Sequence, residues 1–218
     1  MKAYKETEIK KVPNINIVGS LTILDNVVSG FNANNYATAG ELFNPSTNNW
    51  EIGFKITTGN DVSGVQQVIY ESNRGFGSGS MFSPIRLAIS GGNFRICISN
   101  VLTNEASLTG TTAISVNTTY YTKLIFDGTS YKLYISTDGI TYTEEINFTS
   151  STTVYQGLNF LIGRHSNVYG DYQFLGSIDL NQSYININGE RWWDGTIDKP
   201  FNIYKIPKIN KTYYGIGD

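Results

Sequence analysis

Residues 124–142, LIFDGTSYKLYISTDGITY, decide the fold because they contain short apolar strands and the turns that join them. Apolar and polar residues alternate along 131–135, and a period of two is typical of a β-strand covered on one side. The Asp-Gly pairs at 127–128 and 138–139 tolerate the positive φ found at the tips of tight hairpins. We therefore predict two consecutive antiparallel hairpins, the second of which returns through residues 140–142.

The same alternation recurs outward on both sides of this stretch. Apolar residues on alternate positions mark further strands at Trp50/Ile52/Phe54/Ile56, Leu87/Ile89, Phe94/Ile96/Ile98 and Leu158/Phe160/Ile162. Two more turn pairs, Gly91-Gly92 and Asn188-Gly189, indicate hairpins, so we expect a meander of successive hairpins. No helical pattern is present to cover the apolar face of such a sheet, and a second sheet must do so. We expect an all-β fold, a two-sheet antiparallel jelly-roll sandwich.

Length and composition favour a single domain. The chain has 218 residues, of which 40% are hydrophobic and 16% charged, and this is enough apolar material for one large sandwich. No internal repeat or long linker divides it. We expect an N-terminal arm over residues 1–13, the sandwich over 14–198, and a C-terminal strand or tail over 199–218.

Charge and cysteine content exclude several classes of partner. The formal net charge is -2 and no block of Lys or Arg matches a phosphate backbone, so we expect no nucleic acid partner. The charged amino terminus is unlike a secretory signal and no segment reaches membrane-spanning length, so we expect no membrane insertion. Cys97 is the only cysteine and lies in an expected strand, which indicates a half-buried structural thiol.

The acidic residues and the histidine do not form a recognisable catalytic pattern. A glycosidase needs two carboxylates facing one sugar, and the only acidic pair at i, i+2 spacing is Glu6 and Glu8, in the N-terminal arm. His165 is the only histidine, which excludes a His-based metal cluster. We predict no enzyme and no catalytic residues. Two distant carboxylates that converge in space keep a glycan hydrolase as an alternative.

Five segments carry a family resemblance through their order along the chain. They are VVSGF at 27–31, NWEIGFK at 49–55, YKLYISTDG at 131–139, LIG at 161–163 and FLGSIDL at 174–180. In this order they resemble the laminin G-like members of the concanavalin A-like lectin/glucanase superfamily, of the kind found in bacteriophage tail and other virion structural proteins. The resemblance covers residues 15–195, most of the chain.

The resemblance implies a curved two-sheet sandwich that often holds carbohydrate or protein ligands, and it does not imply one activity. The expectation is a non-catalytic binding module on a phage or phage-like virion. Its partners would be a glycan or host surface receptor and other virion proteins. Extracellular placement by a route without a signal peptide is the other localisation. A purely structural capsid-decoration or tail protein without a ligand remains an alternative, and a homo-oligomer stays open.

A polar and aromatic loop between two expected strands is the candidate ligand site. Sugar sites are built from flat rings that stack on C–H faces and from amide and carboxylate groups that hydrogen-bond hydroxyls. The loop supplies Arg164, His165, Asn167, Tyr169, Asp171 and Tyr172. The alternative is an ordinary loop whose tyrosines shield the edge of the sandwich, and the abundance of tyrosine in the chain favours it.

Trp192 and Trp193 are adjacent in an expected strand and should point to opposite faces. We expect one of them in the core and the other partly exposed. An exposed tryptophan could stack on a ligand or form an oligomer contact, and Trp193 therefore joins the candidate ligand residues. A structural role in closing the second sheet is the favoured alternative.

Calcium is the one cofactor that the sequence leaves open. Oxygen-rich stretches at Asp25-Asn26 and at residues 32–35 could supply hard ligands, and relatives implied by the resemblance sometimes bind calcium. No EF-hand spacing appears, and Asn-rich stretches more often serve turns than metals. We therefore predict no metal ligands and no cofactor.

Overall fold

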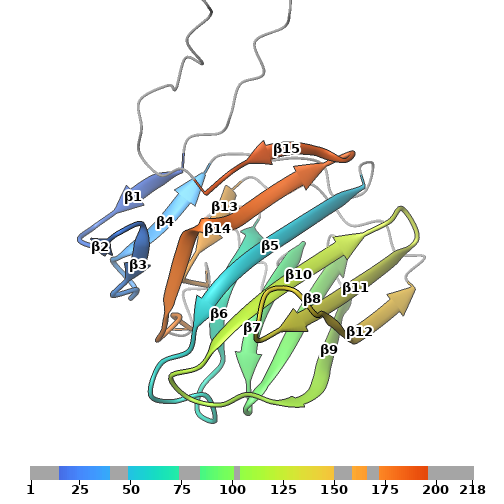
Figure 1. Cartoon of the computed structure of the whole chain (residues 1–218), viewed down its shortest axis with the longest axis horizontal. Helices are drawn as coiled ribbons and strands as arrows, with labels where there is room; N and C mark the ends of the chain where they lie inside the picture. Colours follow the sequence, from blue (N-terminus) through green and yellow to red (C-terminus); the bar gives the residue numbers. More distant parts are fainter. Residues whose placement is uncertain are drawn as a thin grey trace, which may run out of the picture.

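The chain folds as two antiparallel sheets packed face to face, as the computed structural model shows (Figure 1). The structure describes residues 15–39, 49–73, 84–100, 104–149, 159–165 and 172–195. Every regular element within these ranges is a strand, which confirms the expected all-β sandwich. None of these residues forms a helix with the length and apolarity needed to cross a membrane. The boundaries predicted for the two arms lie outside the described residues.

The described residues form fifteen strands, which the two sheets share. In spatial order the seven-stranded sheet consists of β1 (Asn16–Val18), β4 (Tyr36–Ala39), β13 (Asn159–Ile162), β6 (Gln67–Asn73), β7 (Ile85–Ser90), β8 (Asn93–Asn100) and β9 (Asn104–Ala113). The eight-stranded sheet, which lies in front in Figure 1, consists of β12 (Thr143–Thr149), β11 (Ser130–Ser136), β10 (Thr119–Phe126), β5 (Trp50–Thr57), β14 (Ser177–Ile187), β3 (Val27–Ser29) and β2 (Thr22–Leu24), with β15 (Glu190–Trp193) paired to β14.

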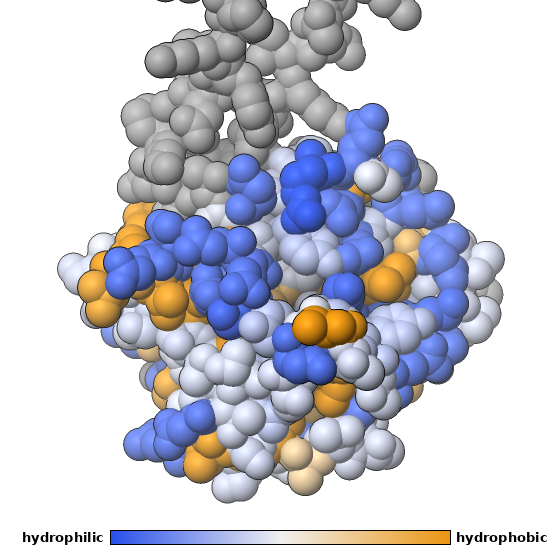
Figure 2. All heavy atoms as spheres, viewed as in Figure 1, coloured by the Kyte–Doolittle hydropathy of each residue, from blue (hydrophilic) through white to orange (hydrophobic). Residues whose placement is uncertain are grey.

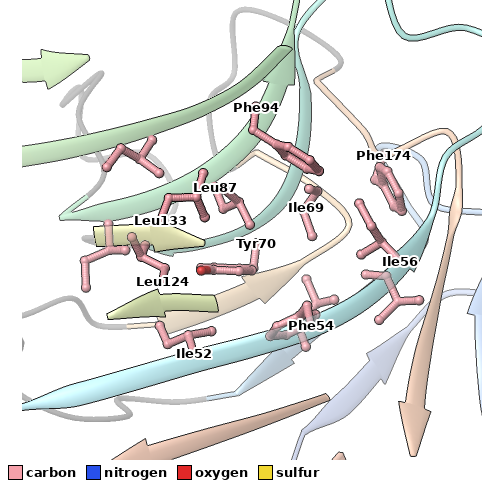
Figure 3. Close-up of a cluster of buried hydrophobic side chains, with 14 of the residues drawn as sticks. Ile52, Phe54, Ile56, Ile69, Tyr70, Leu87, Phe94, Leu124, Leu133 and Phe174 are labelled. Carbon is pink, nitrogen blue, oxygen red and sulfur yellow. The ribbon is translucent and has the colours of Figure 1, made fainter. Parts of the chain in front are cut away.

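The alternation along β5 explains why the sheets pack against each other. Ile52, Phe54 and Ile56 are buried, whereas Glu51 and Lys55 between them are partly exposed. Figure 3 shows the three apolar side chains of β5 among buried side chains of the opposite sheet. Strands β10 and β11 of the same sheet alternate in the same way. Their apolar face and the buried residues of the opposite sheet form one core.

Aromatic rings form the contact between the sheets at the centre of this core. The ring centroids of Phe54 and Tyr70 lie 4.9 Å apart, and Tyr70 stacks on Phe160 at 5.5 Å. Phe54 comes from the eight-stranded sheet, while Tyr70 and Phe160 come from the other. Rings at these distances add specific attraction to their large buried area, and they fix which part of one sheet faces which part of the other.

Two of the four predicted turns form as tight two-residue hairpins. Ser90 pairs with Asn93 across Gly91-Gly92, and Ile187 pairs with Glu190 across Asn188-Gly189. All four turn residues have φ between 51° and 80°, the left-handed region that glycine and asparagine tolerate best. The meander prediction holds within β6–β9 and within β10–β12. It is wrong for the whole chain, which crosses between the sheets after β1, β3, β4, β5, β9, β12 and β13.

The prediction for Asp138-Gly139 was wrong in detail. Ile135 pairs with Thr143, so the loop that joins the paired ends of β11 and β12 spans residues 136–142 and begins with the last residue of β11. Ile140 is 85% exposed rather than part of a strand. The Asp138 carboxylate accepts the backbone N–H groups of Ile140 and Thr141, both at 2.8 Å. These bonds provide acceptors for backbone N–H groups of a loop that is wider than a two-residue turn.

A carboxylate joins the two sheets along one side of the sandwich. Glu145 in edge strand β12 accepts the backbone N–H of Thr112 at 2.6 Å and its hydroxyl at 2.7 Å. Thr112 belongs to β9, the edge strand of the opposite sheet. This bidentate contact therefore ties two edges that no backbone ladder connects.

We expect the substitution Glu145→Ala to lower the free energy of unfolding by about 1 kcal/mol, because two partly solvated hydrogen bonds to a charged group are lost. Urea denaturation of Glu145→Ala, Thr112→Val and the double variant forms a double-mutant cycle. Thr112→Val keeps the backbone donor, so it should cost less than Glu145→Ala. Strictly additive losses would show that the contact does not couple the sheets.

The hydrogen bonds of the 136–142 loop predict a pH dependence of stability. The N–H of Ile140, the Ser136 hydroxyl and the N–H of Thr141 lower the pKa of Asp138 to about 2, below its ordinary value of 3.8. The contribution is therefore fully present above the unfolded pKa and is lost as the pH falls through about 2. Asp138→Asn should be less stable than the wild type near neutral pH. Urea denaturation should show this difference shrinking between about pH 4 and about pH 2, and a constant difference would contradict the assignment.

Candidate functional site

The predicted ligand loop begins and ends on the face of the seven-stranded sheet that points away from the core. Arg164, His165 and Tyr172 lie in the described part of the chain. The other three predicted loop residues, Asn167, Tyr169 and Asp171, lie outside it and stay a prediction. The contacts of the three described residues show what each stem of the loop does.

His165 belongs to a buried polar network. Its Nδ1 lies 2.6 Å from Oε2 of Glu71 and its Nε2 lies 3.2 Å from Nη1 of Arg86, and all three side chains are buried. A guanidinium can only donate, so Nε2 accepts and Nδ1 carries the proton that Glu71 accepts. Both ring nitrogens are thus engaged inside the protein. Arg86 also donates to Sγ of Cys97 at 3.0 Å, and this thiol is fully rather than half buried.

Arg164 and Tyr172 are also held by internal contacts. Arg164 donates to the carbonyl of Ala33 and its guanidinium lies 4.8 Å from the centroid of the Tyr36 ring. The Tyr172 carbonyl accepts the N–H of Val68 at 3.2 Å, and its ring lies 5.6 Å from the His165 ring. These contacts fix the two stems of the loop to the sheet.

Trp193 is the buried member of the tryptophan pair. It is 1% exposed, and its ring lies 5.8 Å from that of Phe54 in the core. Trp192 is partly buried and packs against the edge of the same core. The candidate role of Trp193 as a ligand-stacking residue is therefore corrected, because β15 turns this side chain inward to close the sandwich.

The outward face of the eight-stranded sheet gathers a second set of aromatic and charged side chains. We call it the tyrosine face and define it by Tyr121, Tyr142 and Tyr184 with Glu51, Lys55, Lys123 and Arg191. Register explains the gathering, because Lys123 of β10 pairs with Gly53 of β5, and Gly53 pairs with Tyr184 of β14. Figure 2 views this side of the molecule, where hydrophilic residues predominate and hydrophobic ones form separate patches.

Tyr184 lies over Gly53, and the Tyr184 ring fits because glycine has no side chain. A Cβ at Gly53 would lie 2.4 Å from ring carbons of Tyr184, closer than real contacts permit. The Tyr184 hydroxyl donates to Glu51, and the guanidinium of Arg191 lies 4.1 Å from the ring centroid. The ring is therefore held on three sides before any ligand arrives.

The 136–142 loop carries Tyr142 onto the same face. Nζ of Lys123 lies 3.8 Å from the centroid of the Tyr142 ring, within the range of a cation–π contact. Tyr121 approaches the loop at Gly139, and Nζ of Lys55 lies 5.5 Å from its ring. The loop is wider than the sequence predicted, and this extra length places Tyr142 against Lys123 of the sheet.

Two tyrosines of this face, Tyr142 and Tyr184, have raised pKa values. Burial, the hydrogen bond to Glu51 and the charge of Glu51 raise the pKa of Tyr184 above its usual value. Burial, followed by the nearby Glu51 and Tyr121, raises the pKa of Tyr142. The hydrogen bond to Asp179, at 2.9 Å, raises the pKa of Lys55 and keeps it cationic.

The sequence contains a signal for this face in the outward positions of β5 and β10. Apart from Gly53 and Ile125, the positions that alternate with the core residues hold polar or aromatic side chains, and Tyr121 is one of them. Tyrosine on the solvent side of a strand is a candidate contact residue. The order of the strands in the sheet must be known before Tyr121 and Tyr184 can be placed on one surface.

Among the described ranges, no group of three or more His, Cys, Asp or Glu side chains comes together as a metal site. The stretches considered for calcium use oxygens in turns: Asn32 Oδ1 accepts the N–H groups of Asn34 and Asn35, and the Asp25 carbonyl accepts from Asn181. The Glu6/Glu8 pair lies outside the described residues.

No family model and no curated protein matches the chain. Among solved structures, the binding domain of botulinum neurotoxin serotype D has a TM-score of 0.57 and 14% identity over 82% of this chain and 43% of that chain. The LG1-3 region of the laminin α2 chain has a TM-score of 0.52 and 12% identity over 73% of this chain and 30% of that chain. The CBM40 of a Ruminococcus gnavus IT-sialidase, bound to α2,3-sialyllactose, has a TM-score of 0.51 and 15% identity over 66% of this chain and 77% of that chain.

At these identities the likeness shows the fold alone, a concanavalin A-like and laminin G-like sandwich. The chain spans less than half of the neurotoxin and laminin chains that it matches. The resemblance seen in the sequence is thereby confirmed for the fold. These comparisons do not bear on a virion.

We expect His165→Ala to lower the free energy of unfolding by about 3 kcal/mol, because it removes a partner from the buried Glu71 and Arg86 side chains. Chemical denaturation followed by circular dichroism measures this loss. Glu71→Gln keeps an acceptor for the Nδ1 proton in its amide oxygen, but it removes the Glu71 charge from the network that holds the buried Arg86 side chain, so it should also lower the free energy of unfolding. Unchanged stability of His165→Ala would contradict a role in holding the sheet.

Proposed function

We propose that this chain is a non-catalytic binding module that holds carbohydrate on its tyrosine face. One observation carries the proposal: three tyrosine rings, two from strands β10 and β14 and one from the 136–142 loop, share one outer face with side chains that donate and accept hydrogen bonds. Aromatic rings stack on the C–H faces of sugars, and charged groups at their edges bond the hydroxyls.

The comparisons support this proposal at the level of the scaffold. The CBM40 structure holds sialyllactose, and the neurotoxin structures are binding domains, one of them in complex with rat synaptotagmin II. Scaffold likeness alone does not transfer a ligand. The tyrosine face supplies what the scaffold cannot, namely a specific group of side chains on this chain.

Display in several copies suits a face of this kind. A single shallow sugar site binds at roughly millimolar affinity, and linked copies raise avidity by about 10² to 10⁴. We place the module on the surface or tail of a phage or phage-like particle that recognises bacterial surface glycans. This placement rests on the segment order in the sequence.

An edge strand favours a second candidate, a structural protein that packs against neighbours. Ile23 and Leu24 in β2 are 46% and 71% exposed, and β2 is the last strand of its sheet. Exposed apolar side chains at a sheet edge are typical of contact surfaces. In that case the tyrosine face would have no ligand.

Substitution of the face and of the predicted loop separates the two binding regions. We expect Tyr142→Ala and Tyr121→Ala each to weaken binding about five- to tenfold, since each removes one stacking ring. The measurement is binding of the multimerised protein to an array of purified bacterial wall polysaccharides. Circular dichroism confirms that each variant is folded.

Tyr169→Ala tests the loop in the same assay. Undiminished binding by Tyr169→Ala, together with the loss in Tyr142→Ala, is the expected pattern. The opposite pattern would move the site to the loop and contradict the assignment to the tyrosine face. If the wild type binds no polysaccharide on the array and Tyr142→Ala leaves assembly unchanged, the structural candidate is favoured.

A further inference from the structure

The carboxylates of the tyrosine face are already engaged by groups of the protein. A carboxylate with its lone pairs engaged has little left for sugar hydroxyls. Four of them on or beside the face accept internal hydrogen bonds: Glu51 from the Tyr184 hydroxyl, Glu144 from the Tyr134 hydroxyl, Asp179 from Lys55, and Asp138 from the N–H of Ile140. Each of these carboxylates therefore has fewer lone pairs left for a ligand than a carboxylate without such contacts.

Two of the cations on this side of the sheet are matched by carboxylates and two are not. Lys55 pairs with Asp179 at 2.9 Å and Lys132 with Asp127 at 3.0 Å. Within the part of the chain that the structure describes, Lys123 and Arg191 meet only tyrosine rings. A cation–π contact orients a cation and leaves its N–H groups without an oxygen acceptor.

The two unmatched cations flank the tyrosines. Lys123 is two strands away from Tyr184 across Gly53, a separation of about 10 Å at ordinary strand spacing. Arg191 lies on the far side, in β15, against the Tyr184 ring. A ligand stacked between them would have cationic hydrogen-bond donors at both ends.

We infer that the tyrosine face selects glycans that carry an oxyanion, a carboxylate or phosphate, which Lys123 and Arg191 bind. This inference rests on the proposed function and specifies its ligand class. An oxyanion supplies the acceptors that these two side chains lack, and charge-assisted bonds are the stronger kind. The net charge of -2 does not oppose this, because charges beyond about 8 Å are largely screened at physiological ionic strength.

Matched pairs of probes test the inference. Lactose is compared with 3′-sialyllactose, and mannose with mannose 6-phosphate, all coupled to the same polymer and presented to the multimerised protein. The wild type should bind at least one anionic probe about tenfold more tightly than its neutral partner. The two pairs distinguish a carboxylate from a phosphate source. The preference should shrink between about 50 mM and about 500 mM salt, as the Debye length falls.

Lys123→Met and Arg191→Met remove the charge and keep much of the side-chain bulk. Each should abolish most of the preference for the anionic probe while neutral binding changes little. Lys132→Met is the matched control, since it changes the net charge of the chain equally but removes a cation that is already paired. An equal effect of all three variants would overturn the inference in favour of general charge attraction.

The failure of this inference and the failure of the proposed function give different results. Binding of neutral and anionic probes alike, with loss in Tyr142→Ala, would overturn the oxyanion assignment and leave carbohydrate binding standing. Preference for an anionic probe that survives both Lys123→Met and Arg191→Met would also overturn it. Binding that Tyr142→Ala does not alter, or no binding to any probe, would count against both.

Discussion

The contact between Phe54 and Tyr70 across the two sheets is the constraint on which the rest of the structure depends. An apolar sheet face must be covered, and in the described residues only another sheet is present to cover it. Once alternate residues of β5 and β6 are committed to this contact, the residues between them must point outward. The chemistry of the molecule is therefore confined to the two outer faces and to the loops.

Charged side chains have different partners on the two outer faces. On the seven-stranded sheet, Glu71 and Arg86 are each within hydrogen-bonding distance of His165, and all three side chains are buried. On the eight-stranded sheet, Lys123 and Arg191 lie against tyrosine rings. The first arrangement uses both ring nitrogens of the histidine inside the protein, whereas a cation–π contact leaves N–H groups without an oxygen acceptor. This difference is why we place ligand binding on the tyrosine face.

The groups of the tyrosine face are held by contacts with one another. Burial and the nearby Glu51 raise the pKa values of Tyr142 and Tyr184, and the Tyr184 hydroxyl donates to Glu51. Firm placement by the sheet favours recognition of a rigid, flat ligand, and multiple copies would compensate for weak individual contacts.

The local part of the fold could be predicted from the sequence, and the site could not. Alternation such as Ile52, Phe54 and Ile56 reports which face of a strand is buried, and Gly91-Gly92 and Asn188-Gly189 report tight turns, because both effects act between near neighbours in the chain.

Only the tertiary structure decided which strands lie side by side, and thus that residues as distant as Tyr121 and Tyr184 share one surface. It also decided that His165, which reads as a loop residue, meets Glu71. Strand order and long-range pairing depend on how whole apolar faces fit together, and a single sequence carries no local mark of that fit.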